Sequence, residues 1–378
     1  MNITIFDHFI KHAVSVERYT SGKQLKFQKI VNGLDAQALS IIDEVLVSYG
    51  SGHLSQEALQ LAITDVITVY SEGYGTNFKE TIARDLATFV ESEYDFQLGS
   101  LNRLTANSLS PTATITSQQI SAISVASPIQ GEPIFNLIDG LSARKAEKLM
   151  AAVRVGIQSG QPISDISKNI SGVLSSSKND LKTIIRTAIQ SNAATVRHTI
   201  YEENSDIIDG VRWFATLDNR TTTTICGPRD GKLYTLSGEP IDHDYVWMGG
   251  PGKAHWNCRS TEIPDIPEAN FGGRPAISAG RNYQSGDNKT SGGKITKATK
   301  SRREKGIYNV QQVRGTTNYE DWLRRQPADF QNDILGIKKG KLFRSGQISL
   351  DDLSDRFGAP ITLEELSAQN LIDIGDDI

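Results

Sequence analysis

The strongest constraint on the fold is a change in hydrophobic periodicity near residue 210. Before it, apolar residues recur at the three-and-four spacing of a helix face, as in SQEALQLAITDVITVY. After it, VRWFATL shows partial alternation of aromatic and β-branched residues, and turn signals follow at Asp218-Asn219 and Asp230-Gly231. These patterns predict an α+β protein with a helical N-terminal region and a central α+β domain.

Local signals predict where several helices begin and end. Ser55 is a candidate N-cap, and Gly73 and Gly75 mark a junction between two helices. Candidate capping boxes pair Asn77 with Glu80, Ser349 with Asp352, and Thr362 with Glu365. The predicted regions are a helical N-terminal region (1–100), a Ser/Thr-rich connector (101–133), a central α+β domain (134–270), a flexible basic arm (271–306) and short C-terminal docking helices (307–378).

The net charge of −4 hides a strong segregation of charge along the chain. Residues 1–135 carry eight basic and fourteen acidic residues, residues 266–350 carry sixteen and seven, and residues 351–378 carry one and eight. The basic part fits an anionic or protein partner, or else a solvated linker that Lys and Arg keep soluble. The basic residues of the arm that could contact an anionic partner are Arg274, Arg281, Lys289, Lys294, Lys297, Lys300, Arg302, Arg303 and Lys305.

The residues best suited to chemistry lie in one short part of the central domain. Cys226, His255 and Cys258 are types that bind zinc, and His255 and Cys258 have the H-x-x-C spacing of ligands on a turn. A fourth ligand is not evident, although His243 or Asp230 are candidates. Two other interpretations stay open: a reduced or disulfide-linked cysteine pair, and two small buried side chains without a metal. No cofactor is otherwise expected.

Several classes of protein are disfavoured by the sequence. It contains no G-x-x-x-x-G-K-[ST] phosphate loop and no dinucleotide-binding glycine pattern, so neither an ATP-driven motor nor a nicotinamide enzyme is indicated. The longest apolar stretches fall far short of the ~20 residues that a membrane helix needs, so we expect no membrane partner. Two cysteines cannot form a disulfide framework.

The order of motifs in the central domain resembles the phage head morphogenesis domain of the Mu F-like minor head proteins. The similar segments are RTAIQSNAATVRHTIYEEN, VRWFATLDNRTTTTICGPRDGKLY and AHWNCRSTEIP, and a looser likeness extends over about 128–370. Trp256 and the lengthened EPIDHDYVWMGGPGKA segment depart from the family pattern. The residues that carry the likeness, besides Cys226, His255 and Cys258, are Arg186, Thr187, Tyr201, Trp213, Leu217, Asp218, Arg220, Thr221, Asp230, Gly231, Lys232, Tyr234 and Arg259.

This resemblance implies a minor head protein without enzymatic activity. Such a protein is assembled in the host cytoplasm and resides in the virion, at the portal vertex or in the capsid interior. The implied partners are the portal protein, the major capsid or scaffold protein, and packaged double-stranded DNA bound non-specifically. The candidate DNA-contacting residues are then the nine basic residues of the arm named above. The alternative is a metal-dependent hydrolase or nuclease, a toxin-like effector that uses the Cys/His/Asp cluster.

Overall fold

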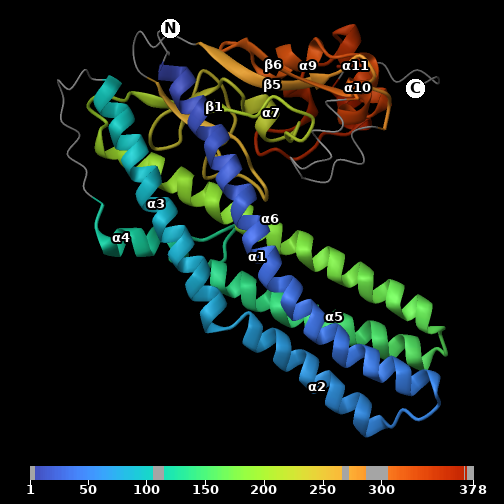
Figure 1. Cartoon of the computed structure of the whole chain (residues 1–378). Coiled ribbons are helices and arrows are strands. Elements are labelled where there is room, and N and C mark those ends of the chain that lie inside the picture. The colour runs from blue at the N-terminus through green and yellow to red at the C-terminus, as the bar shows by residue number, and fades with distance from the viewer. Residues whose placement is uncertain (1–4, 105–114, 266–271, 287–304, 370, 373–378) are drawn as a thin grey trace. The chain divides into compact units, whose positions relative to one another are not determined.

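The computed structural model describes residues 5–104, 115–265, 272–286, 305–369 and 371–372 (Figure 1). The chain forms two compact units. The helical unit comprises Arg18–Tyr94 and Thr114–Ala193, and the mixed unit comprises Met1–Glu17, Asp95–Ala113 and Ala194–Ile378. Within the described ranges, no helix combines the length and apolar character needed to cross a membrane. The α+β fold class predicted from the periodicity is confirmed.

The helical unit is built from long helices, three of which also contribute residues to the mixed unit. The elements are α1 (Ile5–Gly50), α2 (Gln56–Gly73), α3 (Thr76–Leu104), α4 (Ser117–Ser121), the π-helical turn η1 (Ala122–Ala126), α5 (Ile134–Gln158) and α6 (Ile163–Glu203). The helices α1, α3 and α6 are the three that both units share. Residues 117–126 are therefore helical, inside the region that the sequence predicted to be a connector.

Two of the predicted helix signals in this unit behave differently in the structure. The hydroxyl of Ser55 accepts a hydrogen bond from the backbone N–H of Ala58, which confirms it as the N-cap of α2. The predicted cap at Asn77 is wrong, because α3 already begins at Thr76 and Asn77 lies inside the helix. The helical hydrogen bonds start one residue earlier still, where Lys79 N–H donates to the carbonyl of Gly75.

A buried polar network crosses the helical unit. The Asp35 carboxylate on α1 accepts hydrogen bonds from Lys145 Nζ on α5 and, at 3.0 Å, from the hydroxyl of Tyr70 on α2. Lys178 Nζ on α6 lies 3.3 Å from its second oxygen. The side chain of Lys145 is fully buried and that of Asp35 is 4% exposed. Because a buried charge is costly without its partner, this network favours one alignment of four helices.

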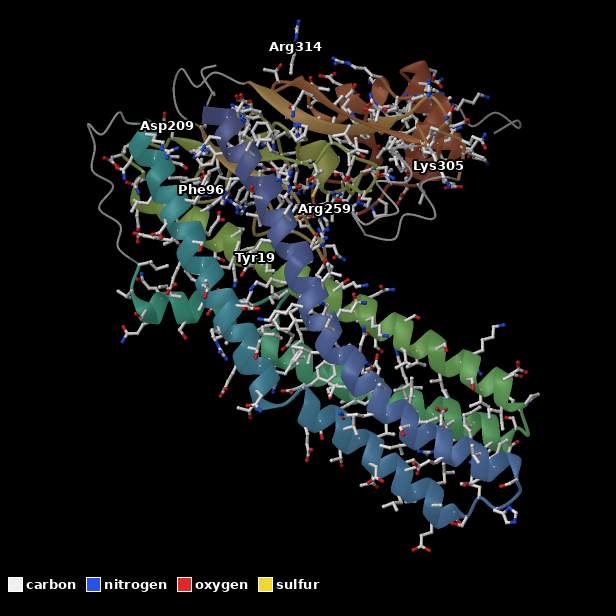
Figure 2. All side chains as sticks on the ribbon, in the orientation of Figure 1. Tyr19, Phe96, Asp209, Arg259, Lys305 and Arg314 are labelled. Carbon is white, nitrogen blue, oxygen red and sulfur yellow. The ribbon has the colours of Figure 1, made fainter. Side chains whose placement is uncertain are left out.

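The mixed unit contains two small antiparallel sheets. Strands β1 (Gly210–Phe214), β2 (Leu233–Tyr234), β3 (Pro240–Ile241) and β4 (Thr261–Asp265) form a sheet in the order β3-β2-β1-β4. Central β1 pairs with β4 over five residues, from Gly210 opposite Asp265 to Phe214 opposite Thr261. At the edge of this unit, His12 of α1 stacks on Phe96 of α3 with ring centroids 3.4 Å apart (Figure 2).

The second sheet is a hairpin that corrects the predicted flexible arm. Strand β5 (Gly273–Ala279) pairs with β6 (Tyr308–Arg314), with Gly273 opposite Arg314 and Ala279 opposite Tyr308. The prediction of a flexible arm from residue 271 is wrong for residues 273–279, because these residues form β5. The inward residues of β5 are Arg274, Ala276 and Ser278, so its buried face lacks the large apolar residues that would have signalled a strand.

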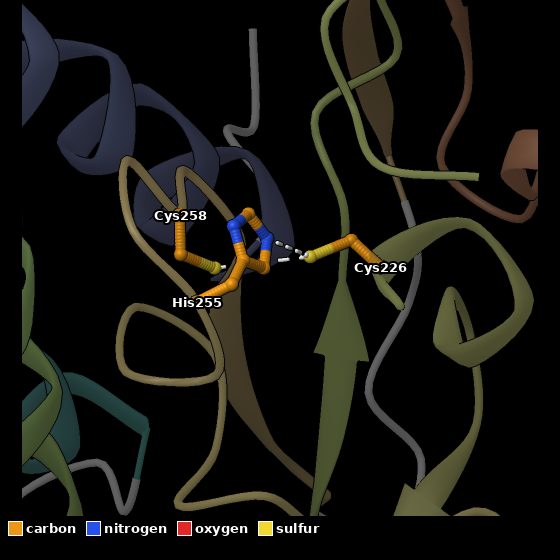
Figure 3. Close-up of side chains that lie close together, drawn as sticks. All are labelled: Cys226, His255 and Cys258. Carbon is orange, nitrogen blue, oxygen red and sulfur yellow. Dashed lines mark hydrogen bonds between the residues drawn. The ribbon is translucent and has the colours of Figure 1, made fainter. Parts of the chain in front are cut away.

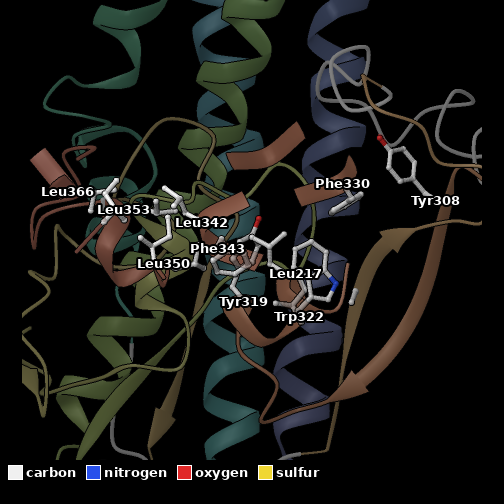
Figure 4. Close-up of a cluster of buried hydrophobic side chains, with 14 residues drawn as sticks. Leu217, Tyr308, Tyr319, Trp322, Phe330, Leu342, Phe343, Leu350, Leu353 and Leu366 are labelled. Atoms are coloured by element: carbon white, nitrogen blue, oxygen red, sulfur yellow. The ribbon is translucent and has the colours of Figure 1, made fainter. Parts of the chain in front are cut away.

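Short helices complete the mixed unit and bury a shared core with the hairpin (Figure 4). They are the helix α9 (Tyr319–Arg324), α10 (Ala328–Leu335), α11 (Ile337–Ser345), the 3-10 turn η2 (Asp351–Leu353) and α12 (Leu363–Ala368). Trp322 and Phe330 pack in one cluster with Leu217 and Ala276, and the Trp322 indole donates to the hydroxyl of Ser278 on β5. Thr362 and Glu365 form the predicted capping box at the start of α12.

Candidate functional site

Cys226, His255 and Cys258 converge inside the mixed unit (Figure 3). Cys226 is the first residue of the short helix α7 (Cys226–Arg229), and Cys258 lies in the turn before β4. Cys226 Sγ is 3.0 Å from His255 Nε2 and 3.8 Å from Cys258 Sγ. Both thiols are buried, at 2% and 0% exposure. The structure thus brings together the three residues that the sequence selected.

Local backbone geometry explains how the H-x-x-C turn forms. Cys258 N–H donates to the carbonyl of His255 at 3.2 Å, which closes the turn. Asn257 adopts a positive φ of 61°, a left-handed conformation that Asn tolerates better than most residues. On the opposite side, the hydroxyl of Thr222 accepts a hydrogen bond from Cys226 N–H at 3.0 Å. These bonds hold the two cysteine side chains toward the same point.

The neighbours of the cluster orient its nitrogen and sulfur atoms. His255 Nδ1 lies 2.8 Å from the carbonyl oxygen of Trp256. The carbonyl accepts a hydrogen bond from Nδ1–H, so the lone pair of Nε2 faces Cys226. The backbone N–H of Gly252 donates to Cys258 Sγ at 3.3 Å. Burial raises the pKa of the Cys226 thiol, whereas the hydrogen bond from Cys226 lowers the pKa of Cys258. The arrangement therefore favours a thiolate at Cys258.

Neither candidate for a fourth ligand reaches this cluster. His243 uses both ring nitrogens elsewhere: Nε2 donates to the carbonyl of Leu233, and Nδ1 accepts from Tyr245 N–H. Asp230 is held by Arg274 and by the backbone N–H of Ala215. Among the described residues, only Cys226, His255 and Cys258 form a group of ligand type. The interpretation of His243 or Asp230 as ligands is therefore wrong.

Two motif residues near the cluster form a buried ion pair. Arg259 (Figure 2) donates to both oxygens of Asp218, at 2.5 and 2.7 Å. The backbone N–H of Arg220 adds a third hydrogen bond to Asp218 at 2.9 Å. Burial raises the pKa of Asp218, but Arg259 outweighs it and holds the pKa well below its usual range. Asp218 and Arg259 thus serve to join the loop after β1 to the segment before β4.

A second buried ion pair joins Asp230 to Arg274. Arg274 Nη1 and Nη2 lie 3.0 and 3.1 Å from the two carboxylate oxygens, and the guanidinium also donates to the carbonyls of Thr317 and Ala215. Arg274 is only 2% exposed. Its prediction as a DNA-contacting residue is therefore wrong, because every face of its guanidinium is engaged inside the protein.

The remaining motif residues are buried or form ion pairs and hydrogen bonds within their own units. Trp213 on β1 is fully buried, and Lys232 forms an ion pair of 3.2 Å with Asp351 and lies over the ring of Tyr245. Arg186 and Thr187 are buried on α6 within the helical unit, where the Thr187 hydroxyl donates to the carbonyl of Thr183.

One structurally important residue was missed by the sequence reasoning. Arg229 is fully buried and donates to the carbonyls of Ile225, Val246 and Arg356. It stands between Cys226 and Asp230 in CGPRDGK, but an arginine in a turn-rich stretch carries no signal that it will be buried. Only the fold reveals that it ties three loops of the mixed unit together.

The other candidate DNA-contacting residues lie between β5 and β6. Arg281 and Lys305 are exposed. Next to them, Gly280 N–H donates to the carbonyl of Ile307 at 2.7 Å, and Asn282 N–H donates to that of Gly306 at 2.9 Å. The backbone is therefore paired where the chain leaves the hairpin and where it returns. The candidates outside the described residues are Lys289, Lys294, Lys297, Lys300, Arg302 and Arg303.

Comparison with known proteins identifies the domain that contains this site. Residues 147–263 match the family model described as Phage Mu protein F like protein. No curated protein and no solved structure matches the chain. The matched range includes both cysteines, His255 and the Asp218–Arg259 pair. Residues 147–263 are thus similar to the phage Mu protein F like family.

Proposed function

We propose that this chain is a minor head protein of the virion, located at the portal vertex or in the capsid interior. There its basic loop, residues 280–307, contacts packaged double-stranded DNA without reading its sequence. Through these contacts the protein affects packaging, retention or ejection of the DNA. The similarity of residues 147–263 to the phage Mu protein F like family supports the general role in head morphogenesis.

The observation that carries the DNA contact is the charge of the basic loop together with its attachment. The loop contains eight basic and two acidic residues, a net charge of +6. Its two ends are hydrogen-bonded to each other through Gly280 with Ile307 and Asn282 with Gly306. The carboxylate of Asp333 on α10 also accepts from Tyr283 and Gly286. Both ends of this cationic segment are thus attached to the mixed unit.

Phosphate contacts alone account for binding of this kind. Lys and Arg that neutralise phosphates release condensed counterions, which provides affinity for any sequence and makes that affinity fall steeply with salt. Sequence readout needs side chains positioned against base edges in a groove. Between Lys289 and Arg303 the basic residues are separated only by Gly, Ser, Thr, Ala and one Ile, which offer no polar side chain long enough for such readout.

The test compares two variants of the full chain with equal changes in charge. One replaces Lys294, Lys297, Lys300 and Arg302 of the loop by Gln. The control replaces the exposed residues Arg144, Lys148, Arg154 and Lys168 of α5 and α6 by Gln. Binding to a double-stranded DNA fragment is measured at increasing salt. Each lost phosphate contact should reduce the slope of log affinity against log salt by about 0.9, and the control should keep the wild-type slope. Equal slopes for all three proteins would rule out the basic loop as the DNA contact.

The partners among head proteins are tested in particles. Cross-linking mass spectrometry on procapsids and mature virions should yield cross-links from this chain to the portal protein and to the major capsid or scaffold protein. Lys residues are exposed in both units, for example Lys148 and Lys341, so each unit has a reactive group. Cross-links confined to tail proteins would contradict a place in the head.

A hydrolase or nuclease that uses the cluster is supported less well. A general base needs a lone pair that is available to the reacting proton. The two carboxylates of the Cys/His/Asp cluster, Asp218 and Asp230, are both bound by arginine side chains. We therefore favour an assembly role over a catalytic one.

A further inference from the structure

The buried Cys/His cluster carries an inference that is independent of the DNA contact. The structure positions three ligand atoms, Cys226 Sγ, His255 Nε2 and Cys258 Sγ, within 4.8 Å of one another. They come from two segments of the chain, the start of α7 and the turn before β4. We propose that these three residues bind one Zn²⁺ ion, which fastens α7 to the turn that contains His255 and Cys258.

The distances fit tetrahedral zinc better than a disulfide. Zinc–sulfur bonds of about 2.3 Å at a tetrahedral angle place two sulfur atoms about 3.8 Å apart. The two Sγ atoms are 3.8 Å apart. A disulfide would need about 2.05 Å. The distance from Cys226 Sγ to His255 Nε2, 3.0 Å, is about 0.5 Å shorter than the tetrahedral value, and a small rotation of the imidazole ring removes this difference.

The hydrogen bonds around the cluster have the pattern of a second coordination shell. A histidine that binds a metal through one nitrogen commonly donates its other N–H to a carbonyl group, which fixes the ring and its tautomer. His255 does this with the carbonyl of Trp256 at 2.8 Å. The bond from Gly252 N–H to Cys258 Sγ, at 3.3 Å, supports a thiolate in the same way.

The described part of the chain provides three ligands, and we assign the fourth position to a solvent molecule. The hydroxyl of Thr222 lies 3.3 Å from His255 Nε2, beside the point on which the three ligand atoms converge. It already accepts from Cys226 N–H, and it donates its own proton to His255 Nε2. Once Nε2 binds the metal, that proton becomes available to orient a bound water. The thiolates and the imidazole suit zinc rather than magnesium or calcium, which prefer oxygen ligands.

The ion would stabilise a part of the mixed unit that has little regular structure. Helix α7 has four residues, and Pro251–Cys258 contains no regular helix or strand. Because an unfolded chain does not present a formed site, the free energy of metal binding contributes directly to folding. Removing the ion should therefore loosen the connection between these segments without affecting the helical unit.

The first measurement is the metal content of the full chain, purified without a histidine tag under reducing conditions. We expect about one zinc per chain in the wild type and less than about a tenth in Cys258→Ser and in His255→Gln. The matched control is His243→Gln, since both nitrogens of His243 are bound to the backbone outside the cluster. It should retain the wild-type zinc content. Zinc loss in this control equal to that in Cys258→Ser would overturn the assigned ligands.

A second measurement does not depend on the variants folding. The wild-type protein is stripped with a chelator and loaded with Co²⁺, which should give the visible d–d bands of a tetrahedral site and a near-ultraviolet thiolate-to-cobalt band. Adding zinc should remove both and raise the midpoint of thermal unfolding by at least about 5 °C over the stripped protein. A wild-type protein that takes up neither metal overturns the proposal. So does one whose mass, under the same reducing conditions, shows Cys226 and Cys258 joined in a disulfide.

Discussion

Asp218 and Arg259 face each other as a two-point ion pair in the interior of the mixed unit, with N–O distances of 2.5 and 2.7 Å. Their side chains are 1% and 8% exposed. The hydroxyl of Tyr319 on α9 donates to the backbone carbonyl of Asp218, which links the same residue to the C-terminal helices. Arg259 directly follows Cys258, so this pair also fixes the position of the H-x-x-C turn.

Replacing one residue of this pair should lower the free energy of unfolding strongly. We predict that Arg259→Met lowers the free energy of unfolding by about 3–5 kcal/mol, because it leaves the Asp218 carboxylate buried without its main partner. The double variant Asp218→Leu/Arg259→Met should lose much less than the sum of the two single changes. Urea unfolding of the four proteins measures the coupling. Additive losses would show that the two side chains do not depend on each other.

The same pair predicts a dependence of stability on acid. The pKa of Asp218 in the folded protein lies below its ordinary value, so the unfolded chain takes up this proton at higher pH than the folded one. The contribution of Asp218 is thus fully present above the unfolded pKa of about 3.9 and is lost as pH falls below it. Unfolding midpoints from pH 6 down to about pH 2 should fall more steeply for the wild type than for Asp218→Asn. The exposed Asp65→Asn change should leave the wild-type slope in place.

Arg274 and Arg281 should respond differently to the same substitution. Arg274→Met leaves Asp230 buried without its cation and should destabilise the protein by about 3–5 kcal/mol. Arg281 is exposed, and Arg281→Met should change stability by less than about 0.5 kcal/mol. Chemical denaturation compares the two. If Arg274→Met were as mild as Arg281→Met, the buried pair of Arg274 would have no structural importance.

In the helical unit, we expect the replacement of Lys145 to lower the free energy of unfolding strongly. Lys145→Met removes the fully buried cation from Asp35 and should cost about 3–5 kcal/mol. Replacing both partners, as in Asp35→Leu/Lys145→Met, should restore most of that stability, since neither buried charge remains. Helical circular dichroism during urea unfolding measures both. A double variant that is less stable than Lys145→Met would contradict this account.

The sequence predicted the features that depend on local periodicity. The helices, the Ser55 cap, the Thr362 capping box and the change to β-structure near residue 210 all follow from residues close together in the chain. The grouping of Cys226 with His255 and Cys258 could also be proposed from the sequence, because cysteine and histidine at turn spacing are an unusual combination.

The features that the sequence missed depend on pairs far apart in the chain. Asp230 and Arg274 are 44 residues apart, and Asp35 and Lys145 are 110 apart. Nothing local distinguishes these four residues from the other charged residues of the chain. Arg274 was assigned to the basic arm because it stands among glycine and polar residues, whereas tertiary contacts turn the stretch RPAISA into a strand. Local propensity does not reveal which carboxylate a distant arginine will meet.

The hydrogen bond between Gly280 and Ile307 brings together the two ends of the segment that connects β5 to β6. The entropy cost of closing a loop grows only slowly with its length, by roughly 0.6 kcal/mol for each doubling. A short epitope inserted between Gly292 and Gly293 would therefore leave the hairpin and its core intact. Such an insertion offers a marker with which electron microscopy can locate this protein, and count its copies, in an assembled head.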